Sequence, residues 1–146
     1  MVIMSKFAEN LLALMLERGL NAPKLANIIE TDRTNITRYL RGERLPKFKV
    51  FVALLEYFNV SADVLLGRLD YVETKVFLEV QPFGDTLRRV MNETKTTQYR
   101  IEKDLGISGG TMYNWLTNKS LPNVHNLMKL ADYMEVSVDY LLGRNK

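Results

Sequence analysis

Residues 1–70 and residues 77–146 are two copies of one sequence pattern, aligned without a gap by a shift of 76 positions. The two copies share 16 identical residues, and these lie in clusters rather than being spread evenly. Because solenoid repeats have periods of only about 20 to 50 residues, each copy is predicted to fold as a small domain with its own core. The densest cluster is Val60, Ser61, Asp63 and Leu65 to Arg68, which recurs as Val136, Ser137, Asp139 and Leu141 to Arg144.

Apolar residues recur at helical spacing within each copy. The spacing i, i+4, i+7 and i+8 predicts an amphipathic first helix. It is made by Phe7, Leu11, Leu14 and Met15 in the first copy and by Phe83, Leu87, Val90 and Met91 in the second. A second helix at about 22–30 is expected to bury Leu25, Ile28 and Ile29, and a third is expected at about 33–40. A fourth helix is predicted after Pro46 and Pro122, and a short fifth helix after Ser61 and Ser137.

The third helix of each copy has local start and stop signals. Asp32 and Ser108 have side chains that cap helix starts, and Gly42 and Asn118 readily take the left-handed conformation that ends a helix. With its short connection to the second helix, this helix completes a helix-turn-helix motif. The predicted fold class is therefore all-α, with two tandem five-helix domains at residues 1–69 and 82–146 and a short extended or β-strand linker at 70–81.

The spacing of apolar residues in the linker differs from the helical spacing of the two copies. Val72, Thr74, Val76, Leu78 and Val80 alternate with Glu73, Lys75, Phe77 and Glu79. Alternation with β-branched residues is typical of a strand. Two interpretations stay open: an extended linker packed on one domain, or a strand that pairs with a second chain and forms a homodimer through Val72–Val80.

Composition argues against several functional classes. The chain has no cysteine and one histidine, His125, so the sequence predicts no disulfide, no thiol nucleophile and no metal site. It also lacks a phosphate-cradling glycine loop and a nucleophile elbow, which predicts a protein that is not an enzyme and has no cofactor or small-molecule ligand. Without a signal peptide or an apolar stretch of about 18 residues, it is expected to be cytoplasmic, with no membrane partner.

The second copy carries an extended motif, with a weaker counterpart in the first copy. The motif comprises Thr97 to Tyr99, Leu105 to Ser108, Trp115, Leu116, Leu121, Pro122, Leu130 to Tyr133 and Val136 to Gly143. With these residues the chain resembles the Xre or phage-repressor-like (lambda-repressor-like) helix-turn-helix family over nearly its whole length. The resemblance implies a sequence-specific transcription regulator of double-stranded DNA, with repression as the expected mode. In that family the third helix enters the major groove, and the start of the second helix and the loop after the third helix hold phosphates.

Carried over by position, the resemblance assigns base-reading residues to both copies. They are Arg33, Thr34, Thr37 and Arg38 in the first copy, and Gly109, Gly110, Tyr113 and Asn114 in the second. Arginine donates two hydrogen bonds to guanine, so the third helix of the first copy is expected to be the main base reader. The phosphate position at the start of the second helix is Gln98 in the second copy but Ala22 in the first.

Local charge also differs between the copies. Residues 33–49 hold six basic residues and one acidic residue, a net charge of +5, whereas residues 109–125 hold only Lys119. Because counterion release scales with the number of phosphate contacts, the first copy is expected to supply most of the electrostatic affinity. The expected phosphate contacts are Arg41, Arg44, Lys47 and Lys49 in the first copy, and Gln98, Gly109, Gly110 and Lys119 in the second.

Each copy departs from the family pattern at the turn. Glu30 stands at the glycine position of the first copy, and Glu102 stands where a small residue is usual in the second. Both departures predict looser packing of the second and third helices. Gly109 and Gly110 leave two hypotheses for the second copy: a bare helix start that meets a phosphate through backbone N–H groups, or a packing or partner-binding role.

Two wider predictions follow. If residues 69–82 are extended they span roughly 45 Å, more than the ~34 Å between half-sites one helical turn apart, so one chain is predicted to reach two half-sites. The alternative function is a protein-interaction adaptor or an antitoxin-like module built on the same fold. A DNA reader needs the basic residues between 33 and 49 exposed on one face, whereas an adaptor exposes an apolar patch.

Overall fold

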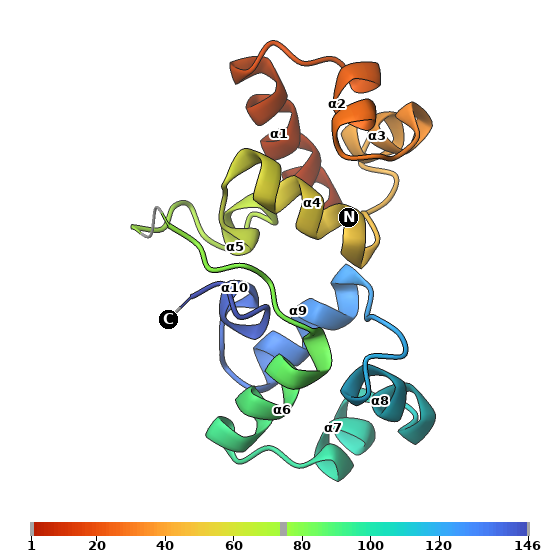
Figure 1. The fold of residues 1–146 in the computed structure, drawn as a ribbon, viewed down its shortest axis with the longest axis vertical. Coiled ribbons are helices and arrows are strands. Elements are labelled where there is room, and N and C mark those ends of the chain that lie inside the picture. The colour runs from red at the N-terminus through yellow and green to blue at the C-terminus, as the bar shows by residue number, and fades with distance from the viewer. Residues whose placement is uncertain (1, 74–75, 146) are drawn as a thin grey trace. The chain divides into compact units, whose positions relative to one another are not determined.

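The computed structural model describes residues 2–73 and 76–145, and in these ranges all regular structure is helical. The chain divides into two compact units, Met1–Val76 (unit 1) and Phe77–Lys146 (unit 2), and five helices are described in each (Figure 1). The prediction of tandem all-α domains is confirmed. No helix in the described ranges combines the length and apolar character needed to span a bilayer.

Unit 1 is built around the third of its helices. Helix α3 packs against both α1 and α2, and α1 also contacts α5. Fully buried apolar residues from all five of these helices form the core, among them Phe7, Leu11, Leu25, Ile36, Leu54 and Leu65. The helices are α1 (Val2–Glu17), α2 (Ala22–Ile28), α3 (Arg33–Leu40), α4 (Phe48–Phe58) and α5 (Ala62–Leu65).

One core prediction for α2 is wrong. Ile28 is 42% exposed, whereas Leu25, Ala26 and Ile29 are buried. Helix α2 ends at Ile28, and at 100° per residue the buried arc is centred between Leu25 and Ala26, which places Ile28 outside it.

Unit 2 repeats this arrangement. Helix α6 packs against α8 and α10, and α7 contacts α8 and α9. The start of α6 approaches the end of α8 closely, because a Cβ on Gly84 would lie 2.6 Å from the carbonyl oxygens of Trp115 and Leu116. The Trp115 side chain lies in this core and is 3% exposed. The helices are α6 (Phe83–Thr94), α7 (Gln98–Leu105), α8 (Gly109–Leu116), α9 (Val124–Tyr133) and α10 (Val138–Leu141).

The turn between the second and third helices has the same backbone form in both units. Gly106 has a φ of 65° and Glu30 a φ of 56°, so Glu30 takes a left-handed conformation that glycine adopts without strain. Helices α2 and α3 nevertheless pack together, and Ala26 between them is buried. The looser packing predicted from Glu30 is therefore wrong. Glu30 adopts the left-handed backbone conformation of the turn, and the contact between α2 and α3 is kept.

The start and stop signals of the third helices hold with one exception. Gly42 and Asn118 have positive φ angles of 70° and 61°, as expected after a helix end. The Ser108 hydroxyl accepts a hydrogen bond of 3.1 Å from the Thr111 amide. Asp32 precedes α3, but its side chain makes no capping hydrogen bond, so that part of the cap prediction is wrong.

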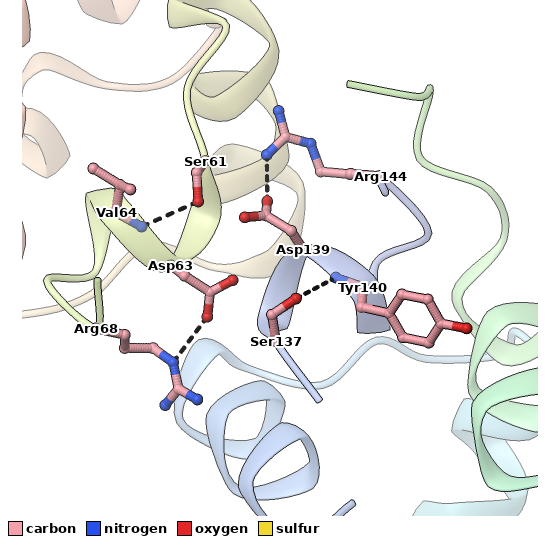
Figure 2. A network of polar contacts seen from close by, with 8 residues as sticks. All are labelled: Ser61, Asp63, Val64, Arg68, Ser137, Asp139, Tyr140 and Arg144. Atoms are coloured by element: carbon pink, nitrogen blue, oxygen red, sulfur yellow. Dashed lines mark hydrogen bonds and ion pairs between the residues drawn. The ribbon is translucent and has the colours of Figure 1, made fainter. Parts of the chain in front are cut away.

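The densest repeated block is structural (Figure 2). In unit 1 the Ser61 hydroxyl accepts from the Val64 amide, and Asp63 pairs with Arg68 at 3.0 Å. In unit 2 the equivalent serine, Ser137, caps α10 in the same way. Asp139 pairs with Arg144 at 2.7 Å, in a pair whose two side chains are only 3% and 2% exposed. Both units therefore close their last helix with a serine cap and an internal ion pair.

The linker forms no strand within residues 70–73 and 76–82, and Thr74 and Lys75 lie outside the described residues. Its second half packs on unit 2, because the Leu78 amide donates to the Arg144 carbonyl at 2.8 Å. The Arg144 guanidinium also lies 4.2 Å from the centre of the Phe77 ring. The second half of the linker therefore packs on one domain, as the first interpretation predicts, whereas pairing of this segment with a second chain stays a prediction.

Candidate nucleic-acid interface

Helix α3 presents a polar face opposite a buried one. Arg33, Thr34 and Arg38 are exposed and Thr37 is half-buried, and at 100° per residue these four side chains fall within an arc of about 140°. Ile36 lies buried on the other side. In the described part of the chain, the guanidinium groups of Arg33 and Arg38 make no hydrogen bond or ion pair. Both cations are therefore available to a partner along α3.

Thr37 can make fewer kinds of contact with a partner than its exposure suggests, because its hydroxyl proton is already used. Its hydroxyl donates to the Arg33 carbonyl at 3.1 Å, the bond by which threonine often satisfies itself inside a helix. The remaining surface is a methyl group and an oxygen lone pair. These groups suit a thymine methyl or a base amino group better than a purine acceptor.

The four basic residues predicted to hold phosphates are exposed. Arg41 follows α3 directly, Arg44 lies in the next loop, and Lys47 and Lys49 lie at the start of α4. Unit 1 as a whole contains eleven basic and nine acidic residues. Because residues 33–49 alone carry +5, the positive charge of unit 1 is concentrated in and after α3.

Asn35 and Tyr39 are candidate site residues that the sequence analysis missed. Asn35 Oδ1 accepts a hydrogen bond from the Arg44 guanidinium at 3.3 Å, and Asn35 Nδ2 donates to Thr31 Oγ1 at 3.0 Å. Nothing in the sequence separates this asparagine from other polar residues of α3, because its role depends on a loop side chain nine positions away. The two residues contribute to a cleft of about 600 Å³ beside α3, lined by Asn35, Tyr39, Arg44, Leu45, Lys47 and Val50.

The corresponding face of unit 2 is short of donors. Gly109 and Gly110 are exposed and have no side chain to offer, and Asn114 is half-buried. Tyr113 is 53% exposed, and the Lys119 ammonium lies 4.8 Å from the centre of its ring. The one basic side chain predicted for this face is therefore engaged with an aromatic surface.

A carboxylate lies at the start of α8. A Cβ on Gly109 would be 3.4 Å from Glu102 Oε1, and Gln98 Nε2 donates to Glu102 Oε2 at 2.8 Å. The missing side chain at Gly109 leaves room for the Glu102 carboxylate beside the start of α8. Gln98 and Glu102 are four residues apart on α7, a spacing from which their contact could have been predicted. The carboxylate at this place compensates the dipole of α8.

Two family models match the chain. Residues 11–65 match a helix-turn-helix family, and residues 86–146 match the Cro/C1-type helix-turn-helix DNA-binding domain. The chain is also similar to the cryptic phage CTXphi transcriptional repressor RstR of Vibrio cholerae serotype O1, with 36% identity over 59 residues. That alignment covers 38% of this chain and 53% of the repressor, so the chain spans about half the length of this curated relative. No solved structure matches the chain.

Proposed function

The chain belongs to the lambda-repressor-like helix-turn-helix family, in two tandem copies, and from this premise we propose that it regulates transcription by binding double-stranded DNA. The observation that carries the proposal is the exposed, unpaired state of Arg33 and Arg38 on α3. Basic side chains in the following loop and at the start of α4 add to it. The relative's description as a transcriptional repressor supports repression as the mode.

The proposed contacts divide by chemistry. Arg33 and Arg38 donate to guanine acceptors in the major groove, and Thr34 and Thr37 contact thymine methyl groups. The phosphates are neutralised by side chains that fix the register of α3 on the duplex without reading sequence. These are Arg41, Arg44, Lys47 and Lys49.

Unit 2 is proposed to contribute less to DNA affinity. Tyr113 and Asn114 are its side chains for base contacts, and Gln98, Gly109, Gly110 and Lys119 its candidates for phosphates. The carboxylate of Glu102 at the start of α8 supports the smaller share, because it repels a phosphate that approaches the same backbone N–H groups.

Selection from randomised duplex DNA tests the function. The wild type is expected to enrich one motif, and the double variant Arg33→Ala/Arg38→Ala none, because each lost base contact removes about 1 to 3 kcal/mol of discrimination. Lys47→Ala is the control: it should keep the motif, weaken all sequences alike and reduce the salt slope by about 1. Enrichment of the same motif by the wild type and the double variant would refute the assignment of base readers.

An adaptor function is the second candidate, and one observation favours it. Leu12 and Leu16 lie four residues apart on α1 and are 46% and 69% exposed. Unit 2 has Arg88 and Asn92 at the same positions. If the wild type enriches no sequence, this apolar face makes protein binding the better account of unit 1.

A homodimer through Val72–Val80 remains part of the proposal. Val76 is 81% exposed and Leu78 is 42% exposed, so both side chains have surface for a second chain to cover. Sedimentation equilibrium should give a dimer for the wild type and a shift toward monomer for Val76→Glu, which places a charge in the contact. A wild type that stays monomeric at the highest measurable concentration would rule out this interface.

A further inference from the structure

The cleft beside α3 contains one donor that the proposed function has not used, the hydroxyl of Tyr39. The Tyr39 side chain is only 3% exposed, and its ring packs edge-to-face on Phe7 at 6.1 Å. Within the described ranges no group hydrogen-bonds to this hydroxyl. The hydroxyl oxygen is also not fully buried. Among the described residues, the one side-chain polar atom that is fully buried and has no hydrogen-bond partner is Asn145 Oδ1. A tyrosine in a core normally has a protein partner for its hydroxyl, and no described protein group is the partner here.

Arg44 is held beside this hydroxyl. Its guanidinium donates to Asn35 Oδ1, and the Asn35 amide is fixed in turn by its bond to Thr31 Oγ1. Burial raises the pKa of the Tyr39 phenol, and the positive charge of Arg44 partly offsets this effect. No carboxylate pairs with Arg44 among the residues described, so most of its N–H groups remain for an anion.

The second copy gives an internal comparison. The positions that correspond to the cleft lining hold no basic residue, and Trp115 at the position of Tyr39 has no hydroxyl. A ring is therefore sufficient to fill this place in the core. A tyrosine hydroxyl and basic side chains occur together at these positions only in the copy that carries the basic cluster. The corresponding residues are Thr111, Trp115, Ser120, Leu121, Asn123 and Asn126.

We infer that this cleft binds a phosphate group, with Tyr39, Arg44 and Lys47 as donors and Asn35 as the positioning residue that holds Arg44. The inference rests on the proposed function, because the phosphate is taken to be one of the DNA backbone that flanks the bases read by α3. Two cationic donors and a hydroxyl that line one cleft suit the oxygens of a phosphate, and a preordered guanidinium loses less side-chain entropy on binding. A free phosphate has the same chemistry, and the experiments separate the two sources.

Tyr39→Phe is the main test, since it removes one oxygen and keeps the ring. The variant is expected to bind the selected duplex and a random duplex about 3- to 10-fold more weakly, with the selected motif and the salt slope unchanged, because no charge is lost. Tyr57→Phe makes the same chemical change elsewhere in unit 1 and should bind like the wild type. For Asn35, the double variant Asn35→Ala/Arg44→Ala should bind no more weakly than Arg44→Ala, since a positioning residue acts through its partner.

Duplexes with single neutral methylphosphonates locate the contact. When the methylphosphonate replaces the phosphate that Tyr39 contacts, the wild type and Tyr39→Phe should bind that duplex with equal affinity, because the oxygen that accepts from the Tyr39 hydroxyl has been removed. Inorganic phosphate forms the second arm, titrated against chloride at equal ionic strength and followed by the NMR signals of the Arg44 side chain. Saturation that Tyr39→Phe abolishes, without any coupled backbone position, assigns the cleft to a free phosphate.

The inference fails if Tyr39→Phe binds both duplexes like the wild type, no backbone position is coupled to it, and phosphate does not shift the Arg44 signals. Its failure can be told apart from failure of the proposed function. A wild type that binds no duplex would refute DNA binding, and the phosphate titration would still decide whether the cleft takes this anion.

Discussion

Glu102 and Ala26 occupy the same position in the two copies, and they give the two recognition helices different electrostatic surroundings. The Glu102 carboxylate lies against Gly109 at the start of α8 and accepts from Gln98. The small Ala26 side chain is buried and carries no charge. A negative side chain at a helix start stabilises the helix and repels a second anion.

Glu102→Gln should therefore strengthen DNA binding by unit 2. In the Arg33→Ala/Arg38→Ala background, where unit 1 reads no bases, we expect about 2- to 5-fold higher affinity for random duplex at low salt, on the order of 0.5 to 1 kcal/mol. Fluorescence anisotropy over a range of salt concentrations measures this. Glu135→Gln removes the same charge after α9 and controls for net charge. Equal gains from the two variants would show that total charge, rather than the start of α8, sets the affinity.

The turn between α2 and α3 stores backbone strain that the turn in unit 2 does not. A residue other than glycine in the left-handed conformation destabilises the folded state by about 1 to 2 kcal/mol. Replacing it with glycine recovers only part of this free energy, because glycine loses more conformational freedom on folding. Glu30→Gly is expected to raise the free energy of unfolding of unit 1 by about 1 kcal/mol, and Gly106→Glu should lower that of unit 2 by a similar amount. Urea denaturation followed by circular dichroism measures both changes. A loss of stability in Glu30→Gly would mean that the glutamate side chain makes a compensating contact.

The helices could be predicted where their signals are local. The start of α3 at Arg33 followed from the residue before it, and its end from Gly42. The features that were predicted wrongly or missed depend on contacts between residues distant in the sequence. The exposure of Ile28 follows from how α2 sits on α3, and the contact of Asn35 with Arg44 requires a loop conformation that no periodicity encodes. The exposure of Arg33 and Arg38 agrees with their helical positions, whereas their roles as base readers stay predictions.

The tether between the units is shorter than the linker predicted from the sequence. The Leu69 amide bonds to the Asp63 carbonyl in unit 1, and the Leu78 amide bonds to the Arg144 carbonyl in unit 2. The chain between these anchors spans at most about 30 Å, against the roughly 45 Å expected for residues 69–82. Since domains of this size are roughly 28 Å across, DNA-reading surfaces on the two units can be separated by no more than about 86 Å.

This limit predicts which DNA sites one chain can bridge. Half-sites one helical turn apart, about 34 Å, are within reach, and half-sites three turns apart, about 102 Å, are not. Inserting about twenty base pairs between half-sites one turn apart should lower the affinity to that of unit 1 alone, as measured by footprinting. Equal protection at both spacings would require two chains on the longer site or release of the Leu78 anchor.

Because the two copies hold different aromatic residues at one core position, only unit 2 contains a tryptophan fluorophore. Its single tryptophan, Trp115, is enclosed in the interior of unit 2, and the matching place in unit 1 is held by Tyr39. Fluorescence excited at the red edge of the absorption band therefore reports the melting of the second domain alone, while circular dichroism follows both. Coincident transitions would mean that the halves unfold as one cooperative body, and separated transitions that each is a folding unit in its own right.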